Sequence, residues 1–226
     1  MKILIVSATP FEITPLLRHL DEGGFRRESA QLYRRGAHEV HLLVTGPGIA
    51  LTAYSLTKAF SKNAFDLTIN AGIAGSYRRD LALGDVVQVA SEQFGDLGVE
   101  EADGSFTDLF ALGLLDPGEW PFRNGALEQS REEPFPGWPA VSGLTVHKVH
   151  GYPPSIEATL HKYRADVETM EGAAFFLVCL MEQQPFLALR AISNYVEARN
   201  REAWEISKAI DQLNKNLIDM LETILA

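Results

Sequence analysis

The chain has 226 residues, of which 46% are hydrophobic and 22% charged, and its formal net charge is −10. This composition is ordinary for a globular protein and too apolar for a disordered one. The acidic balance argues against binding to a nucleic-acid backbone, which requires a basic face. A single cysteine excludes an internal disulfide and fits a reducing compartment.

No repeat, low-complexity tract or linker divides the chain, so we expect a single domain over residues 1–226. The apolar run from Gly172 to Met181 has only ten residues, which is too short to span a membrane. The first residues, MKILIVS, are typical of a buried strand rather than of a signal peptide. The sequence therefore predicts a cytoplasmic protein that binds neither a membrane nor nucleic acid.

Along the chain, short β-branched runs alternate with stretches of helical periodicity. A tight glycine turn is expected at 72–75. Residues 116–141, with five prolines and two tryptophans, show no clear period and are expected to form a lid or a subunit contact. The alternation predicts α/β layers around a mostly parallel, twisted sheet. The expected strands cover 2–7, 40–45, 66–70, 84–94, 143–149 and 185–192, and the expected helices cover 11–21, 49–61, 155–163, 171–184 and 202–225.

Four polar clusters stand where predicted strands end. In the first, Glu12 either completes a capping box with Thr9 or places a carboxylate at the ligand-binding edge of the sheet. In another, Glu168 and Glu171 precede an apolar helix, where a buried carboxylate is costly unless it has a partner. The other two clusters are NAGIAGS at 70–76 and RAISNYVE at 190–197. If the strands end at one edge of the sheet, a single crevice gathers all four clusters.

Metal, thiol and dinucleotide chemistry find little support in the sequence. His147 and His150 are three residues apart beside a strand, which would point them to opposite faces, and no pair has zinc-ligand spacing. Cys179 lies in an apolar helix and is expected to be a buried structural residue. The glycine stretches lack the G-x-G-x-x-G spacing of a dinucleotide-dependent oxidoreductase. We therefore expect neither a metal nor an organic cofactor.

Taken together, these segments resemble the nucleoside phosphorylase / nucleosidase superfamily over nearly the whole chain, and most closely its futalosine hydrolase branch. The stretches that carry the resemblance are SATPFE at 7–12, INAGIAGSY at 69–77 followed by LGDVV, VETMEGAAFF at 167–176, and RAISNYVE at 190–197. The resemblance implies a three-layer α/β/α domain with a central twisted mixed sheet. It also implies a homo-oligomer, a dimer or larger.

The resemblance assigns roles by motif position. Glu12 matches the acid that positions and deprotonates the attacking water. Glu171, with Met170 packed under the ribose, matches the residue that binds its 2′- and 3′-hydroxyls. Asn194 matches the group that bonds the leaving purine. Ala74 and Gly75 match the turn along the nucleoside, and Ser193 matches a further purine contact.

Two departures from related enzymes refine the expected reaction. Adenine-specific nucleosidases carry Asp where this chain has Asn194, whose amide suits a 6-oxopurine: its NH2 donates to O6 and its carbonyl accepts from a protonated N7. Phosphorylases place Arg before the glycine turn, where this chain has Asn70, and basic residues near the first strand, where it has Glu12. Water is therefore the expected nucleophile and hypoxanthine the expected leaving base.

The implied reaction is hydrolysis of the N-ribosidic bond of futalosine to hypoxanthine and dehypoxanthine futalosine. A purine nucleoside phosphorylase, another 6-oxopurine nucleosidase and a non-catalytic nucleoside-binding protein remain as alternatives. The benzoate tail of futalosine needs a donor or a cation, for which Arg78, Arg79 and residues 116–141 are only candidates.

Overall fold

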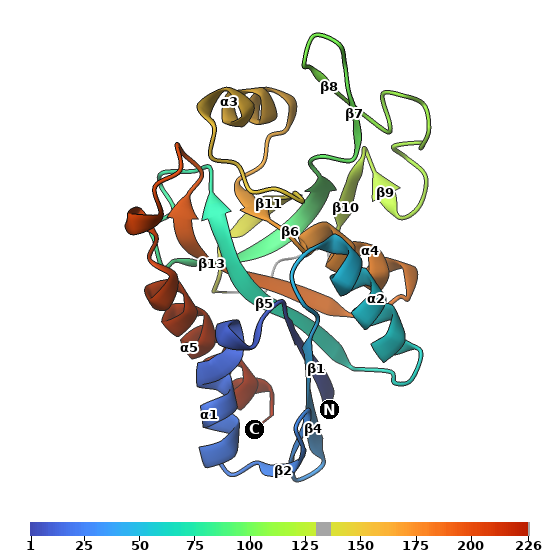
Figure 1. The fold of residues 1–226 in the computed structure, drawn as a ribbon. Coiled ribbons are helices and arrows are strands. Elements are labelled where there is room, and N and C mark those ends of the chain that lie inside the picture. Colours follow the sequence, from blue (N-terminus) through green and yellow to red (C-terminus); the bar gives the residue numbers. More distant parts are fainter. Residues whose placement is uncertain (130–136, 226) are drawn as a thin grey trace.

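The computed structural model describes residues 1–129 and 137–225 (Figure 1). The central feature is a mixed sheet of eleven strands within this part of the chain. Strands β4 (His38–Val44), β1 (Lys2–Ser7), β5 (Leu67–Ser76) and β13 (Phe186–Tyr195) are mutually parallel neighbours. The expected α/β architecture with a mixed sheet is confirmed. The remaining strands of this sheet are β2 (Arg26–Ser29), β3 (Leu32–Arg35), β6 (Val86–Phe94), β9 (Phe122–Arg123), β10 (Ala126–Glu128), β11 (Ala140–Thr145) and β12 (Val167–Thr169).

Helices cover both faces of the sheet, as the three-layer expectation requires (Figure 1). On one face, α1 (Thr14–Glu22) and α5 (Ile206–Ile224) pack over a core that includes Leu16 and Leu213. On the other, α2 (Ile49–Phe60) and α4 (Gly172–Met181) enclose a second core. Helix α4 is buried along almost its entire length, which explains why its sequence is apolar all round.

The longest strands produce an unusual pairing at the middle of the sheet. Strand β13 runs beside β5 along nearly its whole length. On its other edge, β5 pairs with β1 through Asn70 and then, from Gly75, with the antiparallel strand β12. Strands β5, β12, β11, β6 and β13 thereby pair in a closed ring. Between Asn70 and Gly75, that edge of β5 has no strand partner in the described residues.

The tight glycine turn expected at 72–75 is wrong, because β5 continues as a strand to Ser76. Pairing with β13 on one side, and with β12 at the end, keeps the backbone extended. Gly72 is required for close approach: a Cβ there would lie 3.0 Å from Glu12 Oε1. The glycines therefore make room for side chains rather than reverse the chain.

Several other boundaries differ from the expected ones. The helix expected at 11–21 is divided into a 3₁₀ turn, Pro10–Ile13, followed by α1, and the helix expected at 202–225 begins only at Ile206. The hairpin β2–β3 was not expected, because its strands are short and charged. A second small sheet pairs β7 (Gly98–Glu100) with β8 (Phe106–Asp108), and α3 (Pro153–Lys162) lies above β11 in Figure 1.

The region 116–141 contributes to the sheet within its described part. Strand β10 pairs with both β6 and β9, and β11 begins at Ala140. Residues 130–136 of this region lie outside the described residues. None of the helices described is long and apolar enough to cross a lipid bilayer.

One buried polar contact ties the helical layer to the end of β1. The Asn214 side chain of α5 donates to the Glu12 carbonyl at 2.8 Å and accepts from the Leu16 backbone N–H at 3.0 Å. Because Asn214 is only 1% exposed, these bonds cannot be replaced easily by water. The 3₁₀ turn that carries Glu12 is therefore held against α5.

Candidate active site

A cavity of about 330 Å³ opens where β5 changes partner from β1 to β12. Its volume is in the range of small-molecule sites. The seven residues that the resemblance assigns to catalysis and nucleoside binding all line this one cavity. They are Glu12, Ala74, Gly75, Met170, Glu171, Ser193 and Asn194.

Glu12 stands at the unpaired edge of β5. Its Oε2 accepts hydrogen bonds from the Thr9 backbone N–H at 2.9 Å and from the Thr9 hydroxyl at 3.0 Å. Its Oε1 accepts a longer bond from the Ile73 N–H at 3.3 Å, a donor on the strand edge that β1 has left. The capping box forms, and the carboxylate also lines the cavity, so both interpretations of this segment hold.

Glu171 is the N-cap residue of α4, but its side chain does not cap that helix. Oε1 instead accepts from the Gly48 N–H at 2.7 Å, at the start of α2. Burial raises the pKa of Glu171, against the lowering effect of that hydrogen bond and of the Arg190 guanidinium. The Glu12 carboxylate raises the Glu171 pKa further, which shows that the two acids are electrostatic neighbours. The carboxylate of Glu171 retains acceptor capacity for a ligand.

Asn194 and Ser193, at the end of β13, form another part of the cavity lining. The Ser193 hydroxyl donates to Asn194 Oδ1 at 2.8 Å, and Asn194 Nδ2 donates to the Tyr195 carbonyl at 3.0 Å. These bonds fix which end of the amide is donor and which is acceptor, and leave one N–H and one lone pair. Gly75 pairs with Asn194 across the sheet, and a Cβ at Gly75 would lie 3.1 Å from Nδ2.

Sequence reasoning singled out Glu168 but missed its polar contact with His150 on the cavity wall. Glu168 Oε1 accepts from the His150 N–H at 2.9 Å, Oε2 contacts His150 Nδ1, and the Tyr77 hydroxyl donates to Oε2 at 2.6 Å. Burial and the Glu168 carboxylate raise the pKa of Tyr77 well above its usual range, so its proton stays in place. The two acids of VETMEG indicated a polar site in the sequence, but their different partners, His150 for Glu168 and Gly48 for Glu171, follow only from the tertiary structure.

Apolar side chains complete the lining, and the sequence assigned no role to any of them, although Ala8, Phe11 and Ile73 lie in stretches that carry the resemblance. The additional apolar residues are Ala8, Phe11, Pro47, Ile73, Val149, Trp204 and Ile206.

The candidates for a benzoate site are not found at this cavity. Arg78 pairs with Asp80 at 2.5 Å, and Arg79 pairs with Glu197 at 2.5 Å. Neither arginine lines the cavity, nor does any described residue of 116–141. Among the described side chains that line it, none belongs to lysine or arginine.

The histidines and the cysteine that the sequence analysis weighed lie at separate places in the described part of the chain. No group of three or more His, Cys, Asp or Glu residues in the described ranges is arranged to hold a metal ion. His147 bonds Asp96 and His150 bonds Glu168, so the two histidines have separate partners. Cys179 is buried, and burial raises the pKa of its thiol well above the usual value.

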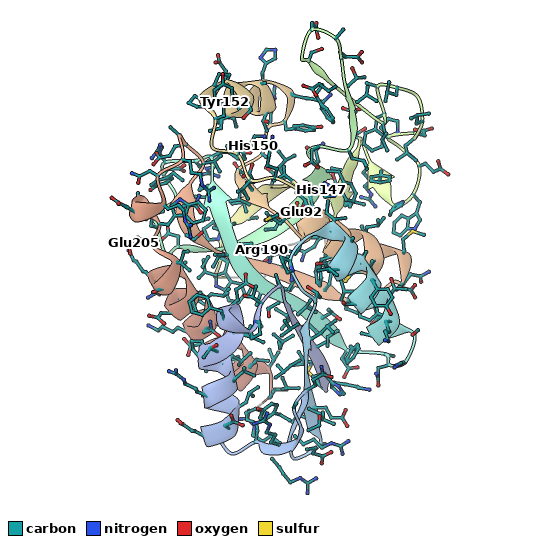
Figure 2. The ribbon with its side chains drawn as sticks, viewed as in Figure 1. Glu92, His147, His150, Tyr152, Arg190 and Glu205 are labelled. Atoms are coloured by element: carbon teal, nitrogen blue, oxygen red, sulfur yellow. The ribbon has the colours of Figure 1, made fainter. Side chains whose placement is uncertain are left out.

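Two buried charged residues, Glu92 and Arg190, do not line the cavity, and Figure 2 labels them near the centre of the molecule. The Arg190 guanidinium donates to the Asn70 carbonyl at 3.1 Å, to the Leu189 carbonyl at 2.9 Å and to the Asn70 side chain. Burial raises the pKa of Glu92 to about 7, although Arg190 and the Thr145 hydroxyl favour its charged form.

Comparison with known proteins shows to which family this chain belongs. The family model of the phosphorylase superfamily matches residues 2–226. The chain belongs to the phosphorylase superfamily. Futalosine hydrolase of Thermus thermophilus is 32% identical over 181 residues, 76% of each chain. Futalosine hydrolase of Streptomyces coelicolor is also 32% identical, over 185 residues that cover 76% of this chain and 74% of the relative.

Solved structures of the superfamily show the same fold. The native futalosine hydrolase of Helicobacter pylori superposes with a TM-score of 0.78 at 19% identity, over 99% of this chain and 98% of that one. A mutant MTAN of the same organism, with 5′-methylthioadenosine in its active site, gives a TM-score of 0.78 at 20% identity over 98% of each chain.

The raised pKa of Glu92 predicts a pH-dependent stability for this member of the superfamily. A carboxyl with a pKa of 4.5 when unfolded and about 7 when folded stabilises the fold fully below pH 4.5, and this contribution is lost as the pH rises through 7. Glu92→Gln lacks this titration. Its free energy of unfolding relative to wild type should therefore increase between pH 5 and pH 8, by on the order of 3 kcal/mol.

Urea unfolding of both proteins at several pH values measures this difference. Glu100→Gln, at an exposed carboxyl of β7, is the matched control and should show little change with pH. A difference between Glu92→Gln and wild type that stays constant across this range would contradict the assignment.

Proposed function

We propose that this protein is a futalosine hydrolase, which cleaves the N-ribosidic bond of futalosine with water to give hypoxanthine and dehypoxanthine futalosine in the alternative menaquinone pathway. The 32% identity to two curated futalosine hydrolases supports the substrate. The observation that carries the reaction type is the cavity lining. It combines Glu12, Glu171 and Asn194, and the described residues contribute no lysine or arginine to it.

At the sugar, the proposed step forms one bond and breaks another. The oxygen of water bonds to the anomeric carbon while the bond from that carbon to N9 of the base breaks. Glu12 takes the proton from the water, and Oε1 suits this role because its one hydrogen bond, from Ile73, is long at 3.3 Å. The carboxylates of Glu12 and Glu171 also favour the positive charge that develops on the ribose.

Glu171 is proposed to bind the 2′- and 3′-hydroxyls of the ribose. A carboxylate can accept from both hydroxyls, and its bond to Gly48 leaves this capacity available. The neighbouring Met170 lines the cavity and would pack under the sugar ring. Binding of the diol would also compensate for the cost of holding a carboxylate in a half-buried place.

The base is proposed to leave against Asn194. Its free N–H would donate to O6, and its carbonyl would accept from N7, which takes up a proton from solvent water as the C–N bond breaks, in balance with the proton that Glu12 takes. Ser193 holds the amide in this orientation by donating to Oδ1. Ala74 and Gly75, on the extended strand β5, would lie along the nucleoside.

Phosphorolysis is the second enzymatic possibility, and the charges disfavour it. Phosphate would need a cation where Glu12 and Glu171 place negative charge. Arg190 is the one Arg or Lys that is buried in the described residues, but it is only 2% exposed and already donates to Asn70 and Leu189. A non-catalytic nucleoside-binding protein would have no need of a poised base at Glu12.

The decisive assay incubates the protein with futalosine, inosine or methylthioadenosine, with and without phosphate, and measures the free base by chromatography. We expect hypoxanthine from futalosine in phosphate-free buffer. Release of hypoxanthine from inosine only when phosphate is present would favour a phosphorylase. Tight binding of futalosine with no turnover would favour the non-catalytic alternative.

Glu12→Gln tests the proposed base. The amide keeps an oxygen that can accept from Thr9 but cannot take up a proton, so kcat should fall by at least about 100-fold. The thermal unfolding temperature should change little, because the capping geometry is preserved. Turnover at the wild-type rate would remove Glu12 from the chemical step.

Asn194→Asp tests the proposed choice of base. Wild type should prefer futalosine over its 6-amino counterpart by at least about tenfold in kcat/KM, because a mismatched buried polar pair costs about 1–3 kcal/mol. The substitution should shrink or reverse this preference, with 6-amino activity rising at lower pH where the new carboxyl is protonated. Equal preference ratios in the two proteins would show that Asn194 does not select the base.

Three further expectations stay predictions for the intact protein. We propose that residues 1–226 act as one domain, that the protein is a homo-oligomer, and that it works in the cytoplasm without a metal or organic cofactor.

A further inference from the structure

The buried carboxylate of Glu92 has no place in the reaction described above. Glu92 lies on β6, is 0% exposed and does not line the cavity. An ionisable group in such surroundings is costly unless it is bonded on all sides. Its contacts therefore indicate what it does.

Two threonine hydroxyls connect Glu92 to the N-terminus of α4. The Thr145 hydroxyl donates to Glu92 Oε2 at 2.8 Å and accepts from the Ala173 N–H at 2.7 Å. The Thr169 hydroxyl lies 3.3 Å from Glu92 Oε1 and accepts from the Gly172 N–H at 3.2 Å. Each threonine hydroxyl thus links the Glu92 carboxyl group by hydrogen bonds to one of the first amides of the helix.

Two glycines leave the space that the carboxylate occupies. A Cβ at Gly143 of β11, or at Gly172 at the start of α4, would overlap the Glu92 carboxylate. The glycine that follows Met170-Glu171 in the sequence therefore allows Glu92 to approach the helix terminus. Glu92, Gly143 and Gly172 thus come from three segments far apart in the chain and fit together at this one contact.

The arrangement has a direct consequence for Glu171. Glu171 is the N-cap residue of α4, next to the first helical amides that lack partners within the helix. Because Thr145 and Thr169 take two of those amides, the Glu171 carboxylate is free to bond Gly48 and face the cavity.

We propose that Glu92, acting through Thr145 and Thr169, is a positioning residue that holds Glu171 in place to bind the ribose diol. This inference rests on the proposed function, because it assigns Glu92 to the diol contact of that reaction. The sequence offers no sign of it, since Glu92 lies 79 positions before Glu171 and outside every recognised motif.

The charges around Glu92 support this role. Arg190, from β13, and Glu171, before α4, are the charged groups that act on it, and the two threonines face it from β11 and β12. The guanidinium of Arg190 attracts both carboxylates, whereas Glu92 and Glu171 repel each other. The hydrogen bonds through the threonines hold Glu92 against the backbone of Gly172 and Ala173, the two residues that follow Glu171.

The test compares substrates with and without the diol. Wild type, Glu92→Gln, Thr169→Val and Thr169→Ser are assayed with futalosine and with its 2′,3′-dideoxy analogue. A misplaced Glu171 loses only contacts to the hydroxyls. The kcat/KM ratio of futalosine to the analogue should therefore fall about tenfold in Glu92→Gln and Thr169→Val. Thr169→Ser keeps the hydroxyl and should restore the ratio to within about twofold of wild type.

Leu180→Ala is the matched control, because it removes a buried side chain from the other end of α4. It should destabilise the protein while leaving the ratio unchanged. If the ratio falls equally in this control, or does not fall in the Glu92 and Thr169 variants, Glu92 has only a structural role.

A binding measurement separates failure of this inference from failure of the proposed function. Calorimetric titration with inosine and with 2′,3′-dideoxyinosine measures the diol preference without turnover. A wild-type protein that does not cleave futalosine would contradict the proposed function. The inference about Glu92 would then be decided by whether the variants lose the preference for inosine, and an unchanged preference would overturn it.

Discussion

The site depends on a gap in strand pairing along one edge of β5, between the end of its pairing with β1 and the start of its pairing with β12. Strand β13 holds the other edge of β5 throughout, so β5 stays extended while its partner changes. The unpaired stretch between Asn70 and Gly75 exposes backbone groups at the bottom of a cavity, and the N–H of Ile73 is bonded there by the Glu12 side chain. A sheet that stayed paired along this edge would have no room for a ligand.

The starts of two helical segments supply the two acids that the proposed reaction uses. The turn after β1 carries Glu12, and the Asn214 side chain of α5 donates to the Glu12 backbone carbonyl. The start of α4 carries Glu171, whose carboxylate reaches across to the first residues of α2. Because each acid is fixed by backbone N–H donors, the site is organised before a ligand arrives, as efficient binding requires.

Three acidic side chains, Glu12, Glu171 and Glu92, lie in or beside the cavity, and hydrogen bonds hold each of them in place. The charge of Arg190, the one Arg or Lys that is buried in the described part of the chain, acts on both Glu92 and Glu171. Its guanidinium is held by carbonyl and amide oxygens of Asn70 and Leu189, so it acts on the acids through its field. Such an arrangement suits a reaction in which positive charge develops on the sugar.

The sequence by itself determined the layered α/β architecture, most element positions and the residues that gather at the cavity. The architecture could be predicted because the spacing of apolar residues indicates which face of each element is buried. The cavity residues could be predicted because the motifs at strand ends carry the resemblance to the superfamily. It misjudged residues 72–75, because the glycines that favour a turn locally are held extended by pairing with β13 and β12. Only the tertiary structure decided that Glu12 both caps a turn and lines the cavity, that Glu168 bonds His150, and that Glu92 reaches α4. Those contacts join segments distant in the chain, and their geometry depends on strand pairing, which no local pattern records.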